Sequence, residues 1–295
     1  MGRTIAAASR AARVERLLAR LEKSARRTRR RSDSEAIHDT RLATRRLAAG
    51  LDVWRDAMRL AARRQAQRVL RRLRRSLGPA REAEVSAALL DARLSALAVE
   101  APTVVPVLLR RLERRATRAR RQAAGLCGRA SVRRVLGRVA RAWKPLAASD
   151  PVRLTDIAAA RTRLLRRASV ARSKLHRGIG SGEPIALHGA RIALKHWRYG
   201  LEWMDGLEAG AATADPDWLR SVQGSLGTLN DLAILQSTLH EMTRGAGVAS
   251  ASGVAAVRRL IGRLDVERRE ELARLGALVE SRAADPLDRP RRARA

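Results

Sequence analysis

The spacing of apolar residues along the chain predicts a succession of amphipathic helices and no strand. Apolar positions recur every three to four residues, and no segment shows the strict alternation of a half-buried strand. Glycine and proline interrupt this pattern and set the expected helix ends, with a kink at Gly78-Pro79. We therefore expect an all-α fold. The expected helices are 5–30, a segment that begins near Ser34 and carries His38, 63–97, 102–125, 132–143, 153–177, 184–208, 216–243 and 254–282.

One ten-residue pattern occurs twice, 150 residues apart. The first copy reads Ile37-His38-x-x-Arg41-Leu42-Ala43-x-Arg45-Arg46, and the second reads Leu187-His188-x-x-Arg191-Ile192-Ala193-x-Lys195-His196. Each copy continues into a matching step, Gly50-Leu51-Asp52 and Gly200-Leu201-Glu202. A second block follows each histidine, Ser76-Leu77-Gly78-Pro79-Ala80-Arg81-Glu82 and Ser225-Leu226-Gly227-Thr228-Leu229-Asn230-Asp231. Two matched blocks in the same order indicate an internal duplication.

The sequence boundary between the two copies is expected at Ser149-Asp150-Pro151, where a polar step precedes a proline. This boundary gives a first helical half over 5–148 and a second over 151–280, together forming a single domain within 1–280. The proline- and arginine-rich tail, 284–295, is expected to be disordered.

On a helical wheel, each copy gathers its basic residues on one face. At 100° per residue, His38, Arg41 and Arg45 fall within about 60° of one another, and His188, Arg191, Lys195 and Arg198 share a face in the same way. A run of basic residues on a helix is usually a solvated face, but its repetition in the same order favours a binding site. Apolar residues of the first copy form a stripe on the opposite side: Ala43, Leu47, Leu51, Trp54 and Met58.

The net charge indicates an anionic partner. Lys and Arg number 62 against 29 Asp and Glu, which gives a formal charge of +33. Self-repulsion of this size must be offset by counterions or by a polyanion. Arginine supplies nearly all of the positive charge, and its planar fork can grip two phosphate oxygens at once.

The duplicated helices and the two Leu-Gly blocks resemble the CHAD domain (conserved histidine α-helical domain) family. The resemblance extends from about residue 5 to about residue 280 and includes the continuation Arg198-Tyr199-x-Leu201-Glu202. It implies two pseudo-symmetric helical bundles around a central basic channel that binds inorganic polyphosphate without catalysis. The chain departs from the family pattern in two places. Glu82 and Glu84 stand where the family usually has Asp, and Ala49 is the counterpart of Tyr199.

The resemblance assigns the binding residues by their place in the motifs. Glu82, Asp231, Asp52 and Glu202 are interpreted as partners that orient the basic residues, and Asn230 as a weaker counterpart of Arg81. Gly78 and Gly227 are interpreted as permitting close helix packing rather than touching the ligand. Arg29, Arg30 and Arg31 are interpreted as a solvated helix end, with an extension of the basic path as the alternative. The predicted polyphosphate-binding residues are His38, Arg41, Arg45, Arg46, Arg81, His188, Arg191, Lys195 and Arg198.

A nucleic-acid-binding protein of the nucleoid or ribosomal kind is the alternative, because the charge alone would suit it. Five tryptophans and one tyrosine leave few aromatic rings for stacking bases. No recognised DNA-reading motif is visible either. Polyphosphate is therefore the expected partner, with weak non-specific binding of nucleic acid as a secondary property.

The sequence shows no arrangement expected of an enzyme, a metal site or a cofactor site. Cys127 has no neighbouring histidine, and His188 and His196 have no acidic residue at ligand spacing between them. There is no glycine-rich phosphate loop. A single cysteine fits a reducing compartment, and no apolar run approaches the length of about 18 residues that a membrane span needs. We expect a soluble cytoplasmic protein that does not bind membranes. Its oligomeric state and an association with polyphosphate granules stay open.

Overall fold

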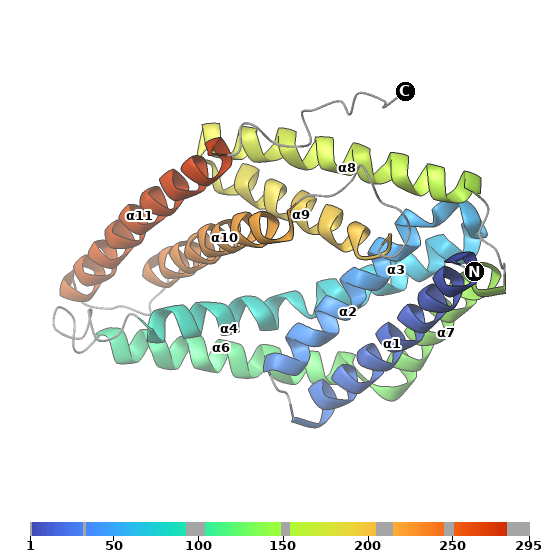
Figure 1. Cartoon of the computed structure of the whole chain (residues 1–295). Coiled ribbons are helices and arrows are strands. Elements are labelled where there is room, and N and C mark those ends of the chain that lie inside the picture. The colour runs from blue at the N-terminus through green and yellow to red at the C-terminus, as the bar shows by residue number, and fades with distance from the viewer. Residues whose placement is uncertain are drawn as a thin grey trace. The chain divides into compact units, whose positions relative to one another are not determined.

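The computed structural model contains only helices in the part of the chain that it describes (Figure 1). That part comprises residues 2–31, 34–92, 104–148, 154–204, 215–244 and 251–281. Within it, no helix is long and apolar enough to cross a membrane. The all-α prediction is confirmed. The elements are α1 (Gly2–Arg31), α2 (Ser34–Val53), η1 (Arg55–Ala57), α3 (Leu60–Ser76), α4 (Gly78–Asp91), α6 (Val104–Leu126), α7 (Arg129–Ala148), α8 (Leu154–Ser181), α9 (Pro184–Leu201), α10 (Pro216–Arg244) and α11 (Ala251–Glu280).

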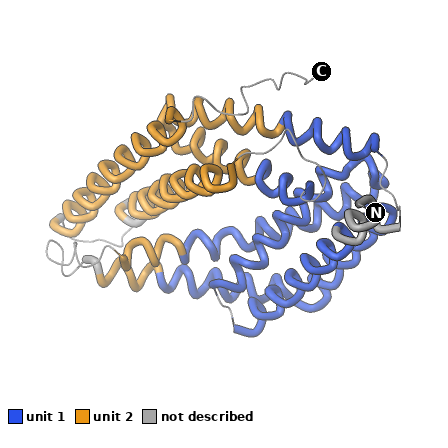
Figure 2. The backbone as a smooth tube through the Cα atoms, in the orientation of Figure 1, with its two compact units in different colours: residues 1–84, 113–166, 196–209 blue, residues 85–112, 167–195, 210–295 orange. Residues whose placement is uncertain are grey.

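The chain forms two compact units that cut across the two sequence halves (Figure 2). Unit 1 comprises 1–84, 113–166 and 196–209, and unit 2 comprises 85–112, 167–195 and 210–295. Each unit therefore takes residues from both sides of residue 150, and α4, α6, α8 and α9 each contribute to both. The halves 5–148 and 151–280 stay a prediction about the sequence repeat, and the tail 284–295 lies outside the described residues.

In unit 1, helices α1, α2, α3 and α7 pack against one another. The apolar stripe predicted on α2 and the residues that follow it is fully in the core: Ala43, Leu47, Leu51, Trp54 and Met58 are all buried. Burial of such side chains is the main favourable term in folding, at about 25 cal/mol per Å² of apolar surface. Because this stripe faces inward, the basic face of α2 is left outside the core.

Two stacked tryptophans pack next to Gly50 in the core of unit 1. Trp143 of α7 and Trp203 stack with ring centroids 4.8 Å apart and planes 16° from parallel. The Trp203 indole N–H also donates to the backbone carbonyl of Arg46 at 2.8 Å. A Cβ built on Gly50 would lie only 2.4 Å from Trp203 Cε2, so this position has no room for a side chain.

The core of unit 2 is formed mainly between α10 and α11. Leucines of α10 pack against apolar residues of α11 and of the segments 85–90 and 108–112. A buried amide also holds α10 on α9, because Gln223 Nε2 donates to the carbonyl of Leu194 at 3.3 Å. This contact fixes the face that α9 turns toward α10.

Several helix ends differ from the prediction at proline and glycine. Helix α7 does not stop before Pro145 but runs through it to Ala148. Only one helical hydrogen bond is lost there, and the buried Trp143 and Leu146 hold both sides of the proline against the core. In place of a kink, the helix expected over 63–97 is divided at Leu77 into α3 and α4.

The interval expected between the helices 153–177 and 184–208, which contains Gly178, Gly180 and Gly182, is mostly helical. Helix α8 continues to Ser181, and only Gly182 takes a left-handed conformation, with φ of 63°. A Cβ on Gly178 would lie 3.4 Å from the carbonyl oxygen of Ala186 and from Leu187 Cα. Gly178 therefore serves the close approach of α8 to α9, and Gly182 alone makes the turn.

Candidate functional site

The two motif blocks of the first copy meet at Arg41. This side chain leaves α2 and donates from Nη1 to the carbonyl oxygen of Arg74, at the end of α3, at 2.9 Å. A Cβ on Gly78, the first residue of α4, would lie 3.4 Å from the same Nη1. The end of α3 therefore holds the guanidinium of Arg41 in place, and Gly78 of the second block provides space for it.

The surroundings of Arg41 are strongly cationic. The pKa of Arg41 is lowered to about 10, first by burial and next by the charge of Arg45, with Arg74 and Arg81 acting in the same direction. Glu82 is the one acid that opposes this lowering. The pKa of Arg74 is lowered too, again first by burial and then by Arg45. We call Arg41, Arg45, Arg74 and Arg81 the arginine cluster.

The arginine cluster is poorly compensated by acids of the chain. In the part of the chain that the structure describes, no carboxylate forms an ion pair with Arg41, Arg45 or Arg74. Arg81 has only a long contact, 4.0 Å from Nη1 to Glu84 Oε2, and that oxygen already accepts from the Ser34 hydroxyl at 2.8 Å. Half-buried guanidinium groups gathered in this way are suited to receive an anion from outside.

Arg46, also predicted to bind ligand, is held by groups of the chain itself. Its Nε lies 2.8 Å from Glu202 Oε2, which agrees with the interpretation of Glu202 as an orienting carboxylate. Arg46 and Arg198 both lie over the ring of Tyr199, with Cζ 6.0 and 5.0 Å from its centroid. Residues of the second copy thus reach α2 within unit 1, and Arg46 takes part in that contact.

In unit 2, the second block contacts the second histidine. His188 Nδ1 lies 2.6 Å from Asn230 Oδ1, and Asn230 Nδ2 donates to Asp231 Oδ1 at 3.1 Å. Because the amide nitrogen of Asn230 is used by Asp231, its oxygen faces the imidazole, and Nδ1 is the donor. His188 itself is exposed on α9, while Arg191 and Lys195 are half-buried. Asn230 therefore orients His188, a role that the sequence reading had not assigned to it.

The nine predicted binding residues divide between the two units. His188, Arg191 and Lys195 belong to unit 2, and the remaining six belong to unit 1. His38 is exposed on α2, and Arg41, Arg45 and Arg81 are half-buried. Sequence reasoning missed Arg74, which lies in an arginine-rich run of α3 outside both motif blocks. The one feature of the sequence that could have pointed to Arg74 is its position just before the Ser76-Leu77-Gly78 step.

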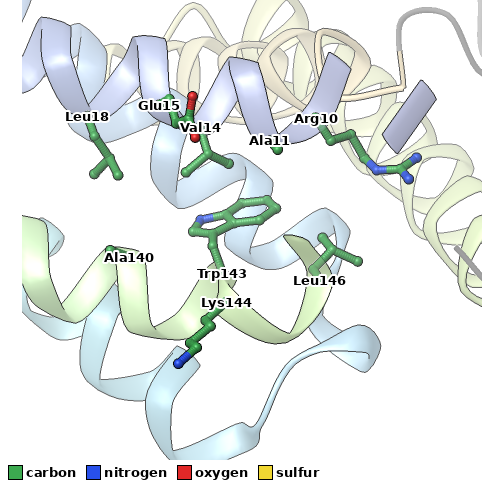
Figure 3. Close-up of a pocket in the computed structure, with 9 residues that line it drawn as sticks. All are labelled: Arg10, Ala11, Val14, Glu15, Leu18, Ala140, Trp143, Lys144 and Leu146. Atoms are coloured by element: carbon green, nitrogen blue, oxygen red, sulfur yellow. The ribbon is translucent and has the colours of Figure 1, made fainter. Parts of the chain in front are cut away.

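An apolar pocket of about 170 Å³ lies between α1 and α7 in unit 1 (Figure 3). Its apolar lining includes Val14 and Leu18 of α1 and Trp143 and Leu146 of α7. The buried Trp143 indole N–H has no acceptor among the described residues. These walls do not suit a phosphate chain, because they would remove its charges from water without pairing them.

The described residues show no further reactive centre. Cys127 is buried, and burial raises the pKa of its thiol to about 11, so it stays protonated near neutral pH. Over the described segments, no group of three His, Cys, Asp or Glu side chains is placed to hold a metal ion.

Comparisons with known proteins identify the family. The chain is similar to the crystal structure of the CHAD domain from the plant Ricinus communis, with 22% identity, a TM-score of 0.69, and coverage of 90% of this chain and 87% of that one. It is also similar to PptA from Streptomyces chartreusis, with 21% identity, a TM-score of 0.62, and coverage of 91% and 98%. No curated protein matches the sequence. The sequence model of the CHAD domain matches residues 12–240, and the chain therefore belongs to the CHAD domain family.

Proposed function

We propose that this protein binds inorganic polyphosphate without altering it chemically, through a basic channel lined by both copies of the motif. The CHAD family is associated in general with polyphosphate-related binding. The observation that carries the proposal for this chain is the arginine cluster, in which the half-buried guanidinium groups of Arg41, Arg45 and Arg74 form no ion pair with an acid of the described residues. A protein with this function acts where polyphosphate accumulates, in the cytoplasm or at its granules.

Polyphosphate fits the arginine cluster for electrostatic reasons. The chain carries about one negative charge per phosphate unit, so arginines side by side can each meet a successive unit. A phosphate between Arg41 and Arg45 would replace their mutual repulsion by two attractions. Charge-assisted hydrogen bonds from guanidinium to phosphate are roughly twice as strong as neutral ones.

Binding without catalysis is consistent with the groups near the cluster. The acid next to Arg41 is Glu82, whose charge is balanced by the arginines around it. The one thiol of the chain is buried and protonated near neutral pH, so it is a weak nucleophile there. The arginine cluster thus offers charge and hydrogen-bond donors, which hold a phosphate chain but do not cleave it.

The aromatic residues favour polyphosphate over nucleic acid. Trp54, Trp143, Trp197, Trp203 and Tyr199 are all buried, with 3% or less of each side chain exposed. The remaining tryptophan, Trp218, donates its indole N–H to the Leu278 carbonyl and is half-buried. Proteins that bind single-stranded nucleic acid usually expose aromatic rings on which bases stack, and these six rings are placed otherwise.

Affinity for long-chain polyphosphate should fall steeply with salt. Each phosphate contact contributes a slope of about −0.7 to log K against log salt, by analogy with single-stranded nucleic acid. Contacts from the four cluster arginines alone therefore give a slope of roughly −3, or about a 50-fold loss of affinity between 50 and 200 mM salt. Titrations at several salt concentrations, followed by fluorescence anisotropy of labelled polyphosphate, measure this slope.

Single-stranded DNA at equal charge concentration is the control for this experiment. We expect it to compete weakly at physiological salt, because its phosphates are more widely spaced and its bases find no exposed ring. Equal competition by DNA would favour the nucleic-acid alternative. An affinity that is flat with salt would exclude the arginine cluster as the site.

His188 should contribute to the binding of polyphosphate. Its Nδ1 is held by Asn230 Oδ1 at 2.6 Å, which leaves Nε2 as the ring nitrogen that can face a ligand. Affinity should therefore fall in His188→Gln and stay unchanged in His176→Gln, which removes an exposed histidine of α8. Titrations followed by fluorescence anisotropy measure both variants. Equal affinities of the two variants would assign His188 a scaffold role.

A further inference from the structure

A second basic pocket lies in unit 1, where the end of α1 meets the start of α7. The two helices pack side by side (Figure 1). The pocket has a volume of about 260 Å³, larger than that of the apolar pocket between the same helices. None of its residues belongs to the duplicated motif. Its charged walls are Glu22, Arg26, Arg29 and Arg30 of α1 and Arg129 and Arg133 of α7.

The arginines of this pocket are not matched by acids. Glu22 is the only carboxylate in the wall, and none of the five arginines forms an ion pair with any acid of the described segments. Other arginines of α1 are paired. Arg20 lies 3.0 Å from Asp39, and Arg27 lies 2.9 Å from Glu35. Toward its end, helix α1 therefore pairs Arg20 and Arg27 with acids of α2, whereas Arg26, Arg29 and Arg30 of the pocket form no ion pair with an acid of the described segments.

The first turn of α7 adds hydrogen-bond donors near the same pocket. Gly128 precedes the helix and accepts the Val132 N–H at 3.0 Å, so it occupies the capping position. Without a side chain it cannot cap the amides of residues 129–131, which have no acceptor within the helix. The start of a helix also carries a partial positive charge, which attracts anions.

We propose that this pocket is a second site for a phosphate chain, one that takes a short run of linked phosphate groups. The arginines carry several charges within one concavity, so a singly charged anion would leave most of them unmatched, whereas an oligophosphate matches several at once. The proposal depends on the proposed function in one respect, the class of ligand. Free oligophosphate and a stretch of long polyphosphate offer the same chemistry, and tripolyphosphate and long-chain polyphosphate serve as probes that distinguish them.

Cys127 provides a direct reporter of this pocket. It lines the pocket and is the only cysteine of the chain, so its alkylation is unambiguous. Burial raises the pKa of the thiol to about 11, while the charge of Arg29 opposes that increase. A phosphate chain would neutralise Arg29 and fill the pocket that Cys127 lines, which blocks the approach of a reagent to the thiol from that side. Both effects slow the reaction with iodoacetamide.

The experiment measures the alkylation rate of Cys127 in the full-length protein, with and without tripolyphosphate. We expect at least about a tenfold slower reaction at saturating tripolyphosphate, because the thiol reacts only from the unoccupied state. Arg29→Ala/Arg133→Ala should lose this protection. Arg161→Ala, which removes an exposed arginine of α8, should keep it. Should the double variant fail to fold by circular dichroism, Arg133→Ala alone serves, because that side chain is exposed.

Equal alkylation rates of the wild-type protein with and without tripolyphosphate would overturn the proposal, as would full protection of the pocket variant. Long-chain polyphosphate at the same phosphate concentration is the second probe. Protection by both probes assigns the pocket to any stretch of chain, and protection by tripolyphosphate alone assigns it to free oligophosphate. Arg41→Ala separates this site from the arginine cluster, since it should weaken long-chain binding and keep Cys127 protected. If long chains do not bind while tripolyphosphate protects through Arg29 and Arg133, only the proposed function fails.

Discussion

The Gly50→Ala variant should lose about 3 kcal/mol of its free energy of unfolding, because the new methyl group overlaps two rigid rings. The added Cβ would lie 2.4 Å from Trp203 Cε2 and 2.8 Å from Trp143 Cζ2. Neither ring can move aside easily. Trp203 is tied to the Arg46 carbonyl by its indole N–H and is stacked on Trp143. Urea unfolding followed by circular dichroism measures the loss.

Gly137→Ala is the matched control for this variant. Gly137 is a helical glycine of the same unit, and a Cβ built on it has no atom within 4 Å. Alanine there should stabilise the protein by about 0.5–1 kcal/mol, because glycine is the poorer helix former. If the Gly50 variant unfolds at the same urea concentration as the Gly137 variant, the two tryptophans do not pack against Gly50 in solution.

The hydrophobic period was enough to predict the all-α fold and the inward face of α2. All five residues of the predicted apolar stripe are buried, because a spacing of three and four leaves one side of a helix for the core. The spacing of apolar residues does not predict whether a single proline or glycine ends a helix. Pro145 is tolerated inside α7 because buried residues on both sides hold the helix, which is tertiary information.

The composition of the compact units could not be predicted from the repeat. Sequence similarity divides the chain near residue 150, whereas the units exchange segments across that point. A long helix can pack one of its ends in one core and its other end in a second core, so a single helix can contribute residues to both units. Trp203 shows the consequence, since it lies after the second motif copy in the chain and packs against Gly50 of the first.

Residue types and spacing predicted which segments come together, and the binding role of the nine residues stays a prediction. Gly78, in the second block of the first copy, lies next to Arg41, and Asn230, in the second block of the second copy, contacts His188. What each residue does depends on neighbours that the spacing does not reveal. Arg74 enters the arginine cluster from a run of α3 with no motif match, Asn230 orients a histidine, and Arg46 is paired with Glu202.

Arg41→Ala and Arg191→Ala should each weaken the binding of long polyphosphate by roughly 10- to 150-fold, which corresponds to the loss of one charge-assisted contact of about 1.5–3 kcal/mol. The stability of the free protein should change little in Arg41→Ala. The variant loses one hydrogen bond to the Arg74 carbonyl, but it also removes the two main causes of the lowered pKa of Arg41, which are the burial of its charge and the repulsion from Arg45. Affinity is measured by anisotropy and stability by urea unfolding, with Arg161→Ala as the charge-matched control.

The two variants together test whether both motif copies serve one ligand. A phosphate chain that contacts both copies must lose affinity in both variants, whereas the Arg161 control should change affinity by less than about twofold, since an exposed charge acts only through the screened overall field. Wild-type affinity in Arg191→Ala would mean that the arginine cluster is the whole site and that the second copy is a structural repeat. Unfolding of Arg41→Ala would instead make its bond to α3 a support of the fold. A shared channel requires that both variants fold and that both lose affinity for polyphosphate.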